Sequence, residues 1–125
     1  MILDTNAVSA WWQGNDSLTS IISNASAVYL VVPVLAEFRF GILKSSRRSQ
    51  METWLDEATR ATTFLAADTA TAECYAQTRY EMEAKGRKIP MNDLWIAAIA
   101  RQHRLPILSR DTHFDLVENL ERISW

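Results

Sequence analysis

Several residue types are scarce in this chain, and each scarcity excludes a class of protein. The single cysteine, Cys74, excludes an internal disulfide and suits a reducing compartment, so we expect a cytoplasmic protein. Three glycines and three prolines leave no low-complexity tract and no flexible linker. We therefore expect the 125 residues to form one domain, 1–125, that buries a core without disulfides or structural metals.

Long apolar runs are absent as well. Residues 17–36 carry no charge, but Ser, Thr, Asn and Pro interrupt them, and the densest apolar run is about half of the roughly 20 residues that a bilayer requires. No basic leader precedes this stretch, so we expect neither a membrane span nor a signal peptide. The net charge of −2 argues against a large non-specific nucleic-acid surface, which is usually basic.

Short apolar runs alternate with longer helical patterns along the chain. Strands are predicted at residues 2–3, 28–32, 62–66 and 105–109, and residues 120–125 are a candidate for a last edge strand. Helices are predicted at residues 7–13, 17–25, 35–43, 45–60, 69–85 and 93–103. Asp68 is a suitable N-cap and Gly86 a suitable residue just past a helix end. The alternation predicts an α/β sandwich with a mainly parallel sheet.

Four acidic residues occupy positions that such a fold can bring together. Asp4 directly follows the first strand and Asp111 follows the strand at 105–109, and the carboxyl ends of parallel strands share one edge, where ligands bind. Glu37 lies one turn into the helix after the second strand and can reach the same edge. Asp93 can do so only if its own helix also starts there, which the pattern does not determine.

A cluster of these carboxylates needs a neutralising partner, because like charges raise one another's pKa. Ligation by oxygen alone suits Mg²⁺ or Mn²⁺. The isolated His103, His113 and Cys74 do not support a zinc site. Taken singly, the three aspartates also fit structural roles in turns or at a helix start. Glu37 fits such a role least, because it interrupts an apolar stretch at 27–43 whose only other charge is Arg39.

Three sequence blocks, in order, resemble the PIN-domain proteins. They are "MILDTN" at the start, "VVPVLAEFRFGIL", and "GRKIPMNDLWIAAIARQHRLPILSRDTHFDLV", the last resembling the C-terminal half of VapC-type toxins. The resemblance spans nearly the whole chain. It implies a PIN-like three-layer α/β/α sandwich with a central, mainly parallel sheet. It also implies a Mg²⁺- or Mn²⁺-dependent endoribonuclease that cleaves RNA phosphodiester bonds with metal-activated water.

The same resemblance implies roles for individual residues. The catalytic set is Asp4, Glu37, Asp93 and Asp111, with Asp4 and Asp93 as the direct metal ligands. Asp115 is an alternative to Asp111, which falls at the family's most variable acidic position. Supporting residues are Thr5, Asn6, Asn92 and Thr112. Candidate RNA-backbone contacts are Arg39, Lys85, Arg87, Lys88 and Arg110.

The resemblance further implies binding partners, and two alternative functions remain open. The implied partners are an RNA substrate such as tRNA or rRNA, a cognate antitoxin protein and a second copy of the chain in a homodimer. One alternative is a PIN-fold RNA- or protein-binding module that has lost catalysis. Another is a receiver-like phosphotransfer domain, but "ILDTN" lacks the early acidic pair of that fold. Trp11 and Trp12 either stack on bases or pack against other side chains.

Overall fold

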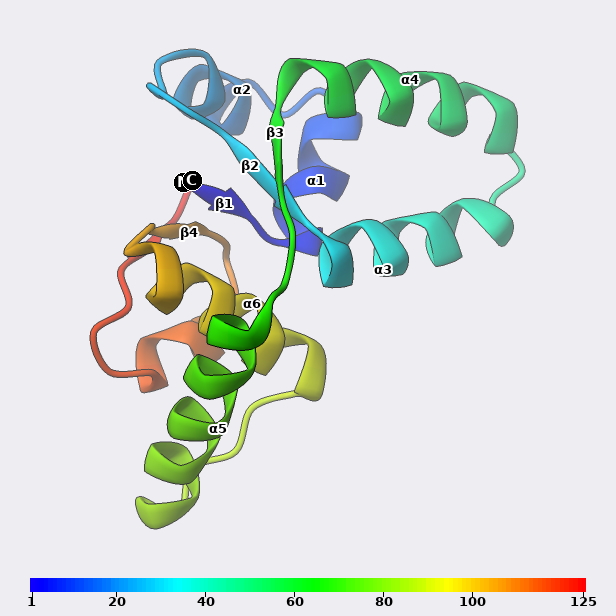
Figure 1. Ribbon diagram of the computed structural model, residues 1–125. Helices are drawn as coiled ribbons and strands as arrows, with labels where there is room; N and C mark the ends of the chain where they lie inside the picture. The colour runs from blue at the N-terminus through cyan, green and yellow to red at the C-terminus, as the bar shows by residue number, and fades with distance from the viewer.

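A five-stranded parallel sheet organises the computed structural model, which describes residues 1–125 (Figure 1). The strands are β1 (Ile2–Leu3), β2 (Tyr29–Val31), β3 (Thr63–Leu65), β4 (Ile107–Leu108) and β5 (Arg122–Ile123). Their order across the sheet is β3-β2-β1-β4-β5, and every neighbouring pair is parallel. The parallel α/β fold is therefore confirmed, including the last edge strand.

The strand order places β1 at a topological switch point. From β1 the chain moves to β2 and β3 on one side, and it then crosses to β4 and β5 on the other. In open parallel sheets the crevice at the carboxyl ends of the two diverging strands binds ligands. The predicted site thus falls where β1 and β4 end.

Six α-helices and one short 3₁₀ helix connect the strands. They are α1 (Thr5–Trp12), α2 (Asp16–Ser23), α3 (Val32–Leu43), α4 (Arg48–Ala61), α5 (Thr69–Ala84), α6 (Met91–His103) and the 3₁₀ helix η1 (Thr112–Leu116). Figure 1 shows α3 and α4 as a hairpin at one side of the molecule, and α5 beside α6 at the other. None of the helices is both long and apolar enough to cross a membrane.

Local sequence signals explain several helix boundaries. Asp4 caps α1, with its side chain accepting a hydrogen bond from the Thr5 backbone N–H. Pro33 lies in the first turn of α3, where its missing N–H costs nothing. Asp68 forms a capping box with Thr71 at the start of α5. Gly86, just past the end of α5, has a φ of +65°, which glycine adopts most easily.

The central strands form the middle of the core. Ile2, Leu3, Ile107 and Leu108 are fully buried, as expected for parallel strands covered on both faces. The predicted three-layer arrangement is therefore confirmed. Helix α6 packs closely on this core, and its residues 96–100 are all buried.

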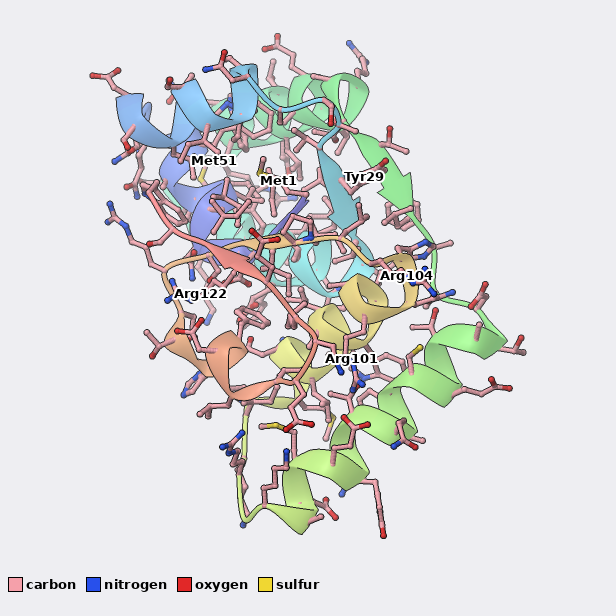
Figure 2. All side chains as sticks on the ribbon, turned by 90° about the vertical axis from the view of Figure 1, so that its left-hand side faces the viewer. Met1, Tyr29, Met51, Arg101, Arg104 and Arg122 are labelled. Atoms are coloured by element: carbon pink, nitrogen blue, oxygen red, sulfur yellow. The ribbon has the colours of Figure 1, made fainter.

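Helices α5 and α6 are joined by a polar network on their shared face. Arg101 extends from α6 toward α5 (Figure 2). Its guanidinium donates hydrogen bonds to Thr78 Oγ1 at 2.7 Å and Glu81 Oε2 at 2.8 Å. The hydrogen bond from Arg101, and after it the one from Gln77, hold the pKa of Glu81 below its ordinary value. Nearby, Trp95 is half-buried and stacks on Tyr75, with 4.2 Å between ring centroids.

The aromatic residues of α1 meet those of α3 and α4. Trp54 lies 5.4 Å from Trp11, 5.6 Å from Trp12 and 5.6 Å from Phe38, measured between ring centroids. These edge and tilted contacts are favourable for aromatic pairs. The structure thus agrees with the packing alternative for Trp11 and Trp12.

Candidate functional site

A pocket of about 520 Å³ lies at the carboxyl edge of the sheet, beside the ends of β1 and β4. Its lining brings together all four predicted acidic residues, Asp4, Glu37, Asp93 and Asp111. Helices α1 and α3 begin directly after β1 and β2, and α6 begins at the same edge before it runs back into β4. Three helix N-termini therefore face this edge, and their dipoles favour negative charge.

Asp4 is held rigidly at the base of the pocket. Its side chain accepts hydrogen bonds from the Thr5 backbone N–H, from Asn6 Nδ2 and from Ser109 Oγ, each at 2.7 Å. Burial raises the pKa of Asp4, the hydrogen bonds from Ser109 and Thr5 oppose that rise, and the charges of Asp111 and Glu37 add to it. Asp4 is 5% exposed. Its ionised form is therefore costly in this fold unless a cation lies beside it.

Asp93 is the least satisfied carboxylate of the pocket. It lies in the first turn of α6, and this helix starts at the same edge of the sheet as α1 and α3. Asp93 therefore reaches the site, which the sequence pattern alone did not determine. Its Oδ2 is buried and has no hydrogen-bond partner. Burial first, then the charges of Asp4 and Asp111, raise the pKa of Asp93 to about 6, while His113 opposes that rise.

Glu37 and Asp111 complete the acidic lining from two other elements. Glu37 Oε2 accepts a hydrogen bond from Thr5 Oγ1 at 2.8 Å, which ties α3 to the start of α1. Asp111 caps η1 by accepting from the His113 backbone N–H at 2.9 Å. Both hydrogen bonds fix a carboxylate at the rim of the pocket while leaving oxygen lone pairs free.

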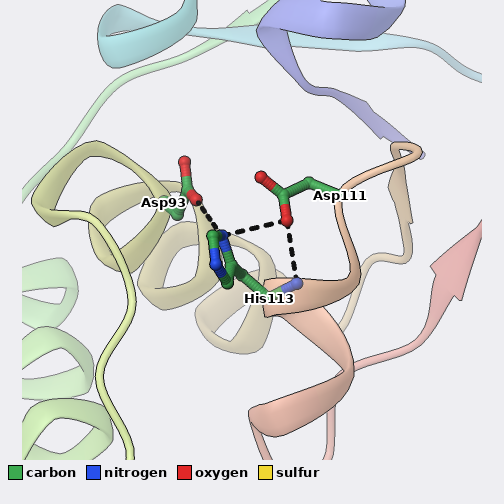
Figure 3. Close-up of side chains that lie close together, drawn as sticks. All are labelled: Asp93, Asp111 and His113. Atoms are coloured by element: carbon green, nitrogen blue, oxygen red, sulfur yellow. Dashed lines mark hydrogen bonds and ion pairs between the residues drawn. The ribbon is translucent and has the colours of Figure 1, made fainter.

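The structure adds His113 to the site, which corrects the prediction that this residue is isolated. Its Nδ1 lies 2.9 Å from Asp111 Oδ1 and 3.5 Å from Asp93 Oδ2 (Figure 3). The Asp111 cap turns the chain so that residue 113 folds back toward α6. Its position two residues after Asp111 was the only sequence signal for this contact.

Ser109 is the second residue that the sequence analysis missed. It is fully buried at the end of β4, where its hydroxyl donates to Asp4 and accepts from Asn6 Nδ2 at 3.0 Å and the Asp111 backbone N–H at 2.9 Å. The same Asn6 accepts from the Arg110 backbone N–H through its Oδ1. The available sequence signal was the serine at the end of the predicted apolar strand 105–109, because a buried hydroxyl needs hydrogen-bond partners.

The alternative acid Asp115 and two of the predicted supporting residues, Asn92 and Thr112, lie outside the pocket lining. Asp115 forms an ion pair with Arg122, with two N–O contacts of 2.7 Å. This contact holds the pKa of Asp115 below its ordinary value. Asn92 and Thr112 are exposed neighbours of Asp93 and Asp111 and do not line the pocket. Thr5 and Asn6, in contrast, line it.

Of the five predicted RNA-contact cations, only Arg110 lines the acidic pocket. Its guanidinium lies 4.7 Å from the Trp125 ring centroid, and its Nε donates to the Trp125 carbonyl oxygen at 3.3 Å. Arg87 and Lys88 line a different pocket, between α5 and the start of α6. Lys85 pairs with Glu118, and Arg39 lies on the outer part of α3 beside Phe40.

The residues of the acidic pocket fit a hard divalent cation. The four carboxylates supply oxygen ligands, which Mg²⁺ and Mn²⁺ prefer. The unpartnered Asp93 Oδ2 is a buried polar atom that a cation would satisfy. Burial first, and the neighbouring carboxylates after it, raise the pKa values of Asp4 and Asp93. The same ion would stabilise the ionised forms of both residues.

Comparisons with known proteins agree with this geometry. The family model for the PIN domain matches residues 1–120. Ribonuclease VapC5 from Mycobacterium tuberculosis (strain ATCC 25618 / H37Rv) is 32% identical over 116 residues, which cover 90% of this chain and 84% of the relative. Toxin FitB from Neisseria gonorrhoeae (strain ATCC 700825 / FA 1090) is 30% identical over 122 residues, which cover 90% of this chain and 88% of FitB.

A solved structure is similar over the whole chain. VapBC2 from Rickettsia felis, bound to a DNA fragment from its promoter, matches with a TM-score of 0.91 and 25% identity, covering 99% of this chain and 97% of the other. The chain therefore belongs to the PIN domain family and is homologous to VapC5 and FitB.

Proposed function

We propose that this protein is a Mg²⁺- or Mn²⁺-dependent endoribonuclease and the toxin of a toxin–antitoxin pair. The observation that carries the proposal is the convergence of Asp4, Glu37, Asp93 and Asp111 on one pocket, with a buried Asp93 oxygen that lacks a partner. The homology to a ribonuclease, VapC5, supports the reaction class. The similarity to VapBC2, a solved toxin–antitoxin assembly, supports a protein partner.

Asp4 and Asp93 are the proposed direct ligands of the cation. Asp4 is buried and the Asp93 side chain is 14% exposed. After burial, the charge of Asp4 is the next cause that raises the pKa of Asp93. When bound there, a divalent cation polarises a phosphoryl oxygen and lowers the pKa of an attacking water. Glu37 and Asp111 would complete the negative charge that holds the ion, and Asp111 takes this place in preference to Asp115, which is paired with Arg122.

Neighbouring residues hold these carboxylates in place. Ser109, Asn6 and the Thr5 backbone N–H fix Asp4, and the Thr5 hydroxyl fixes Glu37. Such preorganisation matters because a displaced ligand or water loses much of the rate. Arg110, at the pocket rim, is the proposed contact for an RNA phosphate next to the scissile bond.

The RNA substrate, the antitoxin and a homodimer complete the proposal. We propose structured RNA, such as tRNA or rRNA, as the substrate, with its backbone at a pocket whose lining includes one arginine, Arg110. An antitoxin bound across the acidic edge would block the same pocket. Cleavage by the purified toxin should therefore fall when the protein encoded beside it is added.

A cleavage assay with matched variants tests the proposal. The purified protein is incubated with tRNA and rRNA in Mg²⁺ or Mn²⁺, with and without EDTA, beside Asp4→Asn and Asp93→Asn. Asp56→Asn, an exposed carboxylate on α4, is the matched control. We expect cleavage by the wild type and by the control, and a loss of at least about 100-fold in the two site variants and in EDTA.

The outcome that contradicts the proposal is equally specific. A well-folded wild type that cuts none of these RNAs in either cation is not a ribonuclease of this kind. RNA binding without cleavage would then favour the catalytically silent binding module.

A further inference from the structure

His113 faces the two carboxylates Asp93 and Asp111 from a third direction. Asp93 comes from α6, while His113 lies in η1 and Asp111 is its N-cap. One ligand atom from each residue lies within 4.8 Å of the others. The three side chains gather at one place, with His113 between the two carboxylates and the start of η1 (Figure 3). These three possible metal ligands, two oxygens and one nitrogen, lie at the acidic pocket.

The spacing of these atoms matches a coordination shell. Ligands about 2.1 Å from an octahedral ion stand about 3 Å apart when they are adjacent. His113 Nδ1 lies 2.9 Å from Asp111 Oδ1 and 3.5 Å from Asp93 Oδ2. Small shifts of exposed side chains would place all three at bonding distance from one ion, because the His113 side chain is 46% exposed.

Hydrogen bonds within this trio cannot satisfy all three of its facing atoms. The Nδ1 of an imidazole carries at most one proton, so it can donate to only one of the two facing oxygens. Asp111 Oδ1 is the nearer acceptor, and Asp93 Oδ2 is left buried without a hydrogen-bond partner. An ion between the three atoms satisfies both oxygens and the nitrogen lone pair together.

We propose that His113, beside Asp93 and Asp111, contributes its Nδ1 as a further ligand to the cation proposed for the acidic pocket, and that this nitrogen favours Mn²⁺ over Mg²⁺. The inference rests on the proposed metal site. Mg²⁺ keeps its waters and prefers oxygen, so it gains little from an imidazole, whereas a transition-metal ion accepts nitrogen readily. His113 therefore acts as a selectivity residue for the metal.

Pulsed electron paramagnetic resonance of Mn²⁺ bound to the full chain tests the nitrogen directly. Modulation from ¹⁴N appears only when a nitrogen is bound to the ion or close to it. We expect this modulation in the wild type and its loss in His113→Gln. His103→Gln is the matched control, because His103 is the other of the two histidines and is exposed at the end of α6.

Calorimetric titration measures the selectivity for Mn²⁺ over Mg²⁺. We expect His113→Gln to weaken Mn²⁺ binding by at least about tenfold, with Mg²⁺ binding changed much less, while His103→Gln binds both ions as the wild type does. Circular dichroism confirms that the variants are folded.

The outcomes separate this inference from the proposed function. Mn²⁺ that binds the wild type without ¹⁴N modulation, or modulation that survives in His113→Gln, overturns the role of His113 and leaves the carboxylate site standing. Equal weakening of Mn²⁺ and Mg²⁺ binding overturns the selectivity. Absence of Mn²⁺ binding to the wild type overturns the metal site and, with it, this inference.

Discussion

The hydroxyl of Ser109 donates a hydrogen bond to Asp4 Oδ2 at 2.7 Å, although 105 positions separate the two residues in the sequence. Ser109 ends β4 and Asp4 ends β1, so the contact joins the two strands of the switch point. The same hydroxyl accepts from the Asp111 backbone N–H. One buried serine thus aligns two of the four carboxylates before any cation binds.

Replacing Ser109 with alanine should weaken both the fold and the reaction. Asp4 would lose a donor and the Asp111 N–H an acceptor inside the protein, which costs about 1–3 kcal/mol. We expect that decrease in the free energy of unfolding from urea denaturation, and a fall in cleavage rate of about tenfold or more. Ser46→Ala, at an exposed turn, is the control. A Ser109→Ala variant with wild-type stability and rate would show that this contact is dispensable.

The stability of the metal-free protein should fall as the pH rises from about 4 to about 6. The pKa of Asp93 is raised to about 6, whereas an unfolded aspartate titrates near about 3.9. Between these values the folded state binds more protons than the unfolded state, so rising pH favours unfolding. The raised pKa of Asp4 acts in the same direction. Urea denaturation in EDTA at several pH values measures the effect.

Asp93→Asn isolates this contribution from other titrating groups. The lowered pKa values of Glu81 and Asp115 act in the opposite direction, since they make stability rise with pH, and they do so mainly below about pH 5. Because the wild type and the variant share both groups, the difference between the two proteins isolates Asp93. We expect the variant to be more stable than the wild type in EDTA at pH 7, and to lose less stability between pH 4 and 6. An identical pH dependence in the two proteins would contradict the assignment to Asp93.

Asp111 and Asp115 should differ sharply when each is replaced by asparagine. Asp111 lines the pocket, so we expect Asp111→Asn to reduce cleavage by about tenfold or more. Asp115 is half-exposed and paired with Arg122, so Asp115→Asn should change the rate little and lower stability by less than about 1 kcal/mol. Initial rates on one tRNA substrate compare the two. If Asp115→Asn reduced cleavage more than Asp111→Asn did, Asp115 and not Asp111 would be the fourth acidic residue of the site.

The Arg101 network should stabilise the fold without affecting cleavage. Arg101→Gln leaves Glu81 without its cation and Thr78 without a donor, at the part-buried contact between α5 and α6. We expect a loss of about 1–3 kcal/mol in the free energy of unfolding. Arg104→Gln, at an exposed position just past α6, should cost much less. Equal stabilities for the two variants would show that the network contributes nothing.

Much of the fold follows from local sequence patterns. The apolar run at 28–32 contains β2 (Tyr29–Val31), and Asp68 and Gly86 mark the two ends of α5 because capping and positive φ are local effects. The strand order and the last strand, β5, agree with the α/β prediction as well.

The site was less accessible to sequence reasoning, because its contacts are tertiary. Asp4 and Asp111 could be placed from strand direction alone, but Asp93 depended on where α6 starts. Ser109 and His113 gain their importance only from partners far away in the sequence or across a turn. The supporting roles predicted for Asn92 and Thr112 came from the family resemblance, yet both residues are exposed and lie outside the pocket lining.

The most direct measurement of the central claim is a crystal structure of the protein grown with Mn²⁺, with anomalous data that locate the ion. The account predicts an anomalous peak in the pocket, within about 2.3 Å of carboxylate oxygens of Asp4 and Asp93. Mn²⁺ at saturating concentration that gives no peak there, or a peak only at other surface carboxylates, would contradict it.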